Sequence, residues 1–149
     1  MPSASLPKTF LLAGTASLLA SCNPFEPAIY TACEEALKAR IKSPASYQRA
    51  SIQMTEHDMD EIGFFVSHDM MDEQDRALRR KLWERNPPKL TNYAVTISYD
   101  AQNGFGALLR NRATCNYFSD DGTYQRASQY TVKINGLSNL EWLRQSLSN

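Results

Sequence analysis

The strongest pattern in the chain is a strict alternation of apolar and polar residues over 92–99, which predicts a half-buried β-strand. Asn103-Gly104 follows as a typical hairpin turn. The segment 109–118 then alternates again, so it is expected to return as the second strand of an antiparallel hairpin. The alternating apolar residues of the first strand are Tyr93, Val95, Ile97 and Tyr99.

Weaker patterns on both sides of this hairpin supply the remaining elements. Alternation predicts strands over 47–55 and 124–134, although an amphipathic helix fits 47–55 nearly as well. Apolar residues at four-residue spacing predict a helix over 28–42, ended by Pro44. A capping-box pattern predicts a final helix over 139–148. The expected fold class is α+β: a three- to four-stranded antiparallel sheet packed by the N-terminal and C-terminal helices.

Residues 56–89 have the composition of a charged insertion between strands, acidic in the first part and basic in the second. Met71, Leu78 and Leu82 predict a helix over 69–85, and its acidic start and basic end suit the helix dipole. Phe64-Phe65-Val66 is an apolar cluster that either packs on the domain or contacts a partner. The candidate partner-contact residues of this insertion are Phe64, Phe65, Arg79 and Arg80.

The N-terminal segment has the three parts of an export signal: a short region containing Lys8, an apolar run of about a dozen residues, and small residues before Cys22. The run is shorter than the roughly 20 residues that a membrane-spanning helix needs. Leu19-Ala20-Ser21-Cys22 resembles the lipobox of bacterial lipoproteins. An ordinary secretory signal and a buried N-terminal helix are the alternatives, and both are weakened by the two prolines that follow Cys22.

The lipobox resemblance implies that residues 1–21 are removed and that Cys22 carries three acyl chains, which is enough for stable anchoring. Residues 22–27 would then form a lipidated tether, and 28–149 a single domain. Within this resemblance, Asn23 in place of aspartate favours the outer membrane, with the domain facing the periplasm.

The cysteine count fits the same interpretation. Three cysteines in an exported protein leave one thiol unpaired. If Cys22 is lipidated, Cys33 and Cys115 remain as a pair in an oxidising compartment, and we expect them to form a disulfide. Two separately buried free thiols are the alternative.

Charge and motifs exclude several classes of function. The formal net charge is zero, so the basic face required for nucleic-acid binding is not expected. Neither a CxxC pair nor a Gly-x-Ser-x-Gly turn is present, and we expect no resident metal and no cofactor. The sequence favours a non-enzymatic envelope protein that acts through protein–protein contacts. The alternative is a small-ligand or divalent-metal-binding module that uses the acidic segment 56–75, including His57 and His68.

A second resemblance covers about half of the expected mature domain. A helix with a cysteine, Lys42-Ser43-Pro44, and Asn103-Gly104-Phe105-Gly106 before a strand with another cysteine are similar to small exported bacterial proteins of uncharacterised function. This resemblance implies the same fold class and the same cysteine pair, and it implies no catalytic residue.

Overall fold

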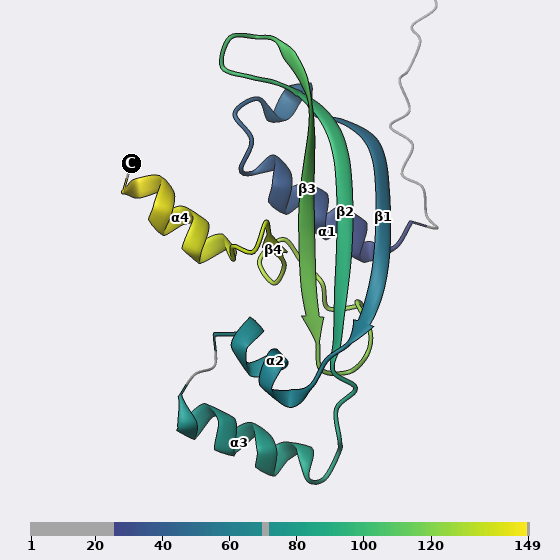
Figure 1. The fold of residues 1–149 in the computed structure, drawn as a ribbon, viewed down its shortest axis with the longest axis vertical. Helices are drawn as coiled ribbons and strands as arrows, with labels where there is room; N and C mark the ends of the chain where they lie inside the picture. The colour runs from purple at the N-terminus through teal and green to yellow at the C-terminus, as the bar shows by residue number, and fades with distance from the viewer. Residues whose placement is uncertain (1–25, 70–71, 149) are drawn as a thin grey trace, which may run out of the picture.

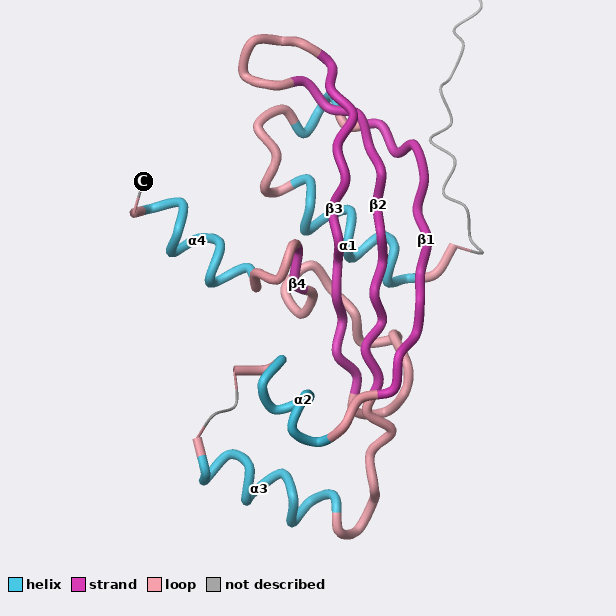
Figure 2. The backbone as a smooth tube through the Cα atoms, in the orientation of Figure 1, coloured by secondary structure: helices cyan, strands magenta, loops and turns pink. Residues whose placement is uncertain are grey.

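The computed structural model describes residues 26–69 and 72–148. A four-stranded antiparallel sheet in the order β1-β2-β3-β4 forms its centre (Figures 1 and 2). The predicted α+β class is therefore confirmed. The elements are α1 Ala28–Lys38, the short 3₁₀ helix η1 Pro44–Ser46, β1 Gln48–Asp58, α2 Glu61–Ser67, α3 Glu73–Trp83, β2 Thr91–Gln102, β3 Leu108–Ser119, β4 Lys133–Ile134 and α4 Asn139–Leu147.

The core lies between α1 and one face of the β2–β3 hairpin (Figure 1). Side chains of β2 alternate between buried and half-buried along almost its full length, as the sequence pattern predicts. α1 presents its predicted apolar stripe to this face. The core residues of the two elements include Ile29, Ala32, Ala36 and Leu37 from the helix and Tyr93, Val95, Ile97 and Tyr99 from the strand.

A disulfide joins α1 to β3 through Cys33 and Cys115, whose Cα atoms lie 5.8 Å apart. Both cysteines are fully buried. Cys115 pairs in register with Val95 in the middle of β2, so the bridge attaches the helix to the centre of the sheet. The predicted pairing is thus confirmed, and the free-thiol alternative is not what the structure has.

The strand predicted over 124–134 is wrong for most of its length. Only Lys133 and Ile134 pair with β3; the preceding segment folds into turns. Ser128 and Thr131 explain the difference, because the Thr131 hydroxyl accepts a hydrogen bond from the Ser128 backbone N–H at 2.9 Å and the Thr131 N–H donates to the Ser128 carbonyl at 3.0 Å. Local bonds of this kind compete with strand pairing.

The C-terminal helix α4 forms where the sequence places it, with the complete capping box between Ser138 and Glu141. None of its described residues is buried, and Figure 1 shows it projecting away from the sheet. Its base is held by Arg40, whose guanidinium donates to the carbonyls of Ile134 and Leu137 at 3.2 and 3.0 Å. α1 ends at Lys38, earlier than the predicted residue 42, so Arg40 lies in the turn that follows the helix.

The charged insertion is helical, as predicted, but it starts later and contains one more helix than expected. β1 continues to Asp58, so His57 belongs to an edge strand. α2 then contains the apolar cluster, and α3 is shorter than the predicted 69–85 helix. Both helices lie at the end of the sheet opposite the tip of the β2–β3 hairpin (Figure 1).

None of the helices in the described ranges combines the length and the apolar character that crossing a membrane requires.

Candidate functional site

An aromatic cluster joins α2 and α3 to each other, and the ring contact of His68 with Phe118 joins α2 to the end of β3. Phe64 and Phe65 are buried, and the ring of Trp83 stacks on Phe65 with centroids 5.4 Å apart. Trp83 also meets Phe64 edge-on at 5.6 Å. Asp60 begins α2 by accepting a hydrogen bond from the Gly63 N–H at 2.7 Å. Phe64 and Phe65 therefore pack inside the protein, which was one of the two alternatives for the cluster, whereas Val66 is exposed.

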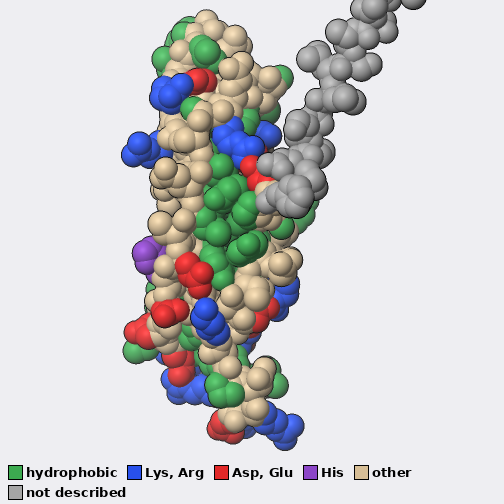
Figure 3. Space-filling view, turned by 90° about the vertical axis from the view of Figure 1, so that its right-hand side faces the viewer, with side chains coloured by type: hydrophobic (Ala, Val, Ile, Leu, Met, Phe, Trp, Pro, Cys, Tyr) green, Lys and Arg blue, Asp and Glu red, His purple; other side chains and the backbone are tan. Residues whose placement is uncertain are grey.

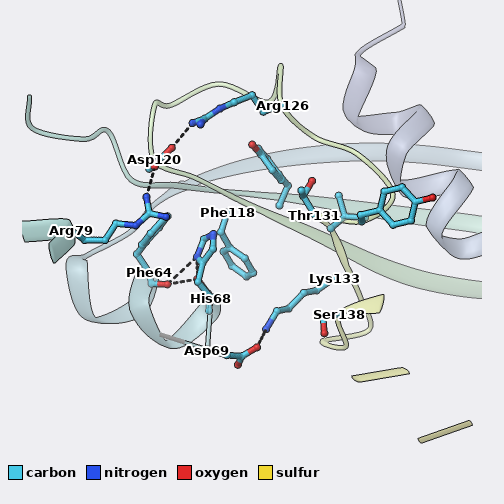
Figure 4. A pocket seen from close by; sticks show the side chains of 14 residues that line it. Phe64, His68, Asp69, Arg79, Phe118, Asp120, Arg126, Thr131, Lys133 and Ser138 are labelled. Atoms are coloured by element: carbon cyan, nitrogen blue, oxygen red, sulfur yellow. Dashed lines mark hydrogen bonds and ion pairs between the residues drawn. The ribbon is translucent and has the colours of Figure 1, made fainter. Parts of the chain in front are cut away.

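This packing leaves an open cavity of about 430 Å³ between α2, the end of β3 and the turn-rich segment before α4 (Figure 4). Its volume lies within the range typical of ligand pockets. Aromatic and aliphatic side chains supply the apolar part of its wall, namely Phe64, Tyr117, Phe118, Tyr130 and Val132. The polar and charged lining residues are Ser67, His68, Asp69, Arg79, Asp120, Arg126, Thr131, Lys133 and Ser138.

Asp120 holds two arginines at one side of the cavity. Arg79 of α3 donates to it at 2.9 Å, and Arg126 donates to its other oxygen. Arg126 also reaches Asp121 at 3.0 Å. The bond from Arg79 joins the insertion to the sheet end, and Figure 4 shows both arginines converging on Asp120 from different segments.

Lys133 and Asp69 form the second ion pair of the cavity, with Nζ and Oδ2 3.3 Å apart. The Lys133 side chain is only 15 % exposed, whereas that of Asp69 is 64 % exposed. Asp69 has a φ of 56°, a left-handed conformation that is uncommon for residues other than glycine. The ammonium group is therefore held within the wall by a carboxylate on its rim.

The charged groups at the cavity balance once Asp121 is counted. Arg79, Arg126 and Lys133 face Asp69 and Asp120, and Arg126 also contacts Asp121, so the formal charge is zero when His68 is neutral. A ligand with a carboxylate beside an apolar group suits this site by replacing one of the protein's carboxylates at a cation while its apolar group contacts the apolar wall.

His68 lies between two phenylalanine rings, with its centroid 4.1 Å from that of Phe64 and 5.9 Å from that of Phe118. Partial burial lowers the pKa of His68, and the Phe64 carbonyl, a hydrogen-bond partner of Nδ1 at 3.1 Å, acts in the opposite direction. The ring is thus neutral at pH 7. Because a carbonyl only accepts, Nδ1 carries the proton in this contact and Nε2 is the acceptor.

Ser67 and His68 are adjacent, but their geometry is that of a helix end. The Ser67 hydroxyl donates to the Phe64 carbonyl at 2.7 Å, the same oxygen that Nδ1 of His68 approaches. Although Ser67 Oγ lies 3.2 Å from that nitrogen, a protonated Nδ1 is not a base for the hydroxyl. The pair ends α2 and does not form a nucleophile with its base.

The structure brings together only part of the predicted contact set. Phe64 and Arg79 line the cavity. Phe65 is buried beside Trp83 and does not line the cavity. Arg80 pairs with Glu61 on the outer side of the insertion. Cys22 lies outside the described residues.

The acidic segment does not assemble a metal site in the described part of the chain. Within residues 26–69 and 72–148, no three His, Cys, Asp or Glu side chains gather closely enough to hold a metal ion. Of the two histidines, His68 lines the cavity and His57 does not.

Several lining residues were not predicted from the sequence, among them Asp120, Arg126, Tyr130 and Lys133. Asp120 follows the strand predicted over 109–118, and the other three lie in the segment 124–134 that was predicted as a strand. The available signal was the Ser128–Thr131 spacing, which is typical of a turn.

No family model, no curated protein and no solved structure matches this chain. The kind of ligand that the cavity binds is therefore inferred from its lining residues alone.

Proposed function

We propose that this protein is a lipid-anchored lipoprotein of the bacterial envelope that acts without catalysis, by binding a partner protein at the periplasmic side of a membrane. Cys22 carries the anchor, and Asn23 favours the outer membrane. Two observations support export: the lipobox-like Leu19-Ala20-Ser21-Cys22, and the buried Cys33–Cys115 disulfide, a feature typical of oxidising compartments.

The observation that carries the binding role is the cavity between α2 and the end of β3. It combines apolar walls with cations already held in place by ion pairs. Because these side chains are already ordered, binding costs them little further conformational entropy. The partner segment that fits it has an apolar side chain next to an acidic one. The acidic group would take the place of Asp69 on Lys133, or add to Asp120 at the arginines.

Photocrosslinking in cells tests this proposal at Tyr130, which lines the cavity and is 71 % exposed. A benzophenone amino acid at this position is expected to give one discrete protein adduct. The same group at Gln53, an exposed position on β1, serves as the control and is expected to give none. Equal adducts from both positions, or no protein adduct at Tyr130, would contradict binding of a partner protein at the cavity.

A charge variant makes the same experiment specific to the cavity. Lys133→Met keeps the aliphatic stem and removes the charge, so the Tyr130 adduct should fall several-fold. Lys89→Met is the matched control, because Lys89 is more exposed and pairs with Glu56 outside the cavity. Its adduct should equal that of the parent protein.

A small molecule is the second candidate ligand, favoured by the cavity volume. Of the acidic segment 56–75, the described residues that line the cavity are Phe64, Ser67, His68 and Asp69. A bound small molecule would leave the Tyr130 probe without a protein adduct, so the crosslinking experiment separates the two candidates.

A further inference from the structure

The tip of the β2–β3 hairpin presents apolar side chains to solvent at the end of the molecule opposite the cavity. Phe105 is 97 % exposed. Leu108 and Leu109, at the start of β3, are also exposed. In Figure 3 this end, at the top, shows hydrophobic and basic side chains, whereas most acidic side chains lie in the lower half.

The turn that carries Phe105 is rigidly bonded. Asn103 accepts hydrogen bonds through its side-chain oxygen from the Phe105 and Ala107 N–H groups at 2.9 and 3.0 Å. Gly106 donates to the Asn103 carbonyl at 3.0 Å with a φ of 81°, a conformation that favours glycine. The fold thus fixes an aromatic ring in a fully exposed position, where it contributes nothing to the core.

Basic residues surround this apolar tip. Arg110 and Arg112 follow the tip along β3, opposite Asp100 and Ser98 of β2, and Arg110 binds the Asp100 carboxylate through two nitrogens. Lys42 lines the same shallow hollow as Asn103 and Leu109. Within the described ranges, neither Lys42 nor Arg112 forms an ion pair.

We infer that this hairpin tip is a second membrane contact, in which Phe105 and the two leucines enter the headgroup boundary of an anionic phospholipid leaflet. Apolar residues flanked by lysine and arginine are the usual composition of interfacial contacts. Each basic residue near an anionic surface contributes about 1 kcal/mol. A second copy of this chain fits the tip less well, because it would bring the same positive charge.

The distance between the tip and the proposed anchor supports this inference, which rests on lipidation of Cys22 under the proposed function. Glu26 forms an ion pair with Arg49, and Arg49 pairs in register with Tyr99. Tyr99 is six residues before Phe105, and β2 ends at Gln102, so the tip lies at most about 20 Å beyond this ion pair. The four residues from Cys22 to Glu26 reach at most about 14 Å, so an obliquely inclined domain can bring anchor and tip to one membrane.

Vesicle co-sedimentation tests the contact with the mature chain carrying Cys22→Ser, which has no acyl chains. The parent should sediment with vesicles of phosphatidylethanolamine and phosphatidylglycerol and not with phosphatidylcholine alone. Phe105→Ser should weaken the partition about tenfold, by removing part of the transfer free energy of one aromatic side chain. Ile62→Ser is the matched control, because Ile62 is exposed on α2 and should leave the partition unchanged.

The charged part of the contact has its own variant. Lys42→Gln combined with Arg112→Gln should weaken binding to the anionic vesicles roughly 30-fold and reduce its salt dependence. No sedimentation of the parent, or an equal loss in Ile62→Ser and Phe105→Ser, would overturn the inference. Because no acyl chain is present, this result is independent of whether Cys22 is lipidated in cells.

Discussion

Reduction of the Cys33–Cys115 disulfide is expected to lower the free energy of unfolding by about 4 kcal/mol. The bridge joins residues 82 positions apart, and closing a loop of this length removes a large part of the entropy of the unfolded chain. Most single domains are stable by only about 5–15 kcal/mol. The reduced protein should therefore be close to unfolding at 37 °C.

Urea unfolding with and without dithiothreitol measures this effect, with thiol content checked by mass spectrometry. The variant that combines Cys33→Ala and Cys115→Ala is the control: it should unfold at low urea, and the reductant should not change its midpoint. A fully reduced wild-type protein with an unchanged midpoint would show that the bridge does not stabilise the fold.

Phe64→Ala is expected to detach the α2–α3 insertion while the sheet remains folded. Phe64 is 1 % exposed and contacts Phe65, His68 and Trp83. Truncating a buried phenylalanine costs about 3–5 kcal/mol. The contacts that hold α2 and α3 on the sheet end are few, so this loss should fall mainly on the insertion and should also remove one wall of the cavity.

Trypsin provides the measurement, because α3 contains several basic residues that are protected only while the helix is docked. If cleavage follows the open population, Phe64→Ala should be cut in α3 at least about a hundredfold faster, since about 1.4 kcal/mol corresponds to a factor of ten. Val66→Ala is the matched control: Val66 is in the same helix but 55 % exposed, and its cleavage rate should stay near that of the wild type. Equal rates in the two variants would show that Phe64 does not dock the insertion.

The central part of the fold could be predicted because a single hydrophobic periodicity determines each of its elements. The alternation in β2 and the four-residue spacing in α1 each bury one face of a regular element. Cys33 lies on the buried face of α1. Cys115 lies opposite Val95 in the hairpin and so shares the buried face of the sheet. The two thiols therefore meet once helix and sheet pack together. Local pattern and long-range packing agree in this part of the chain.

The cavity could not be predicted because its lining depends on where a segment with a strand-like pattern folds into a turn. Alternation over 124–134 suggested a strand, yet Val132 is buried and Tyr130 is largely exposed, because a turn around Ser128 and Thr131 reorients the segment. That turn brings Lys133 to Asp69, a residue 64 positions earlier. A sequence pattern with a period of two contains no information about such a reversal.

Neighbouring arginines illustrate the same limit. Arg79 and Arg80 are equivalent as members of a basic run. Because adjacent residues of a helix point in different directions, Arg79 contacts Asp120 and Arg80 contacts Glu61. The choice is made by Phe64 and Phe65, whose burial against Trp83 sets the rotation of α3. Tertiary packing thus decides which charge belongs to the cavity.

The mature N-terminus is the feature on which anchoring, location and the membrane contact of the hairpin all depend. Mass spectrometry of the protein extracted from bacterial membranes measures it most directly. We expect a chain that begins at Cys22, carries the added mass of acyl chains on that residue, and contains no free thiol. A chain that begins upstream of Cys22, or an unmodified Cys22, would contradict the proposed lipoprotein.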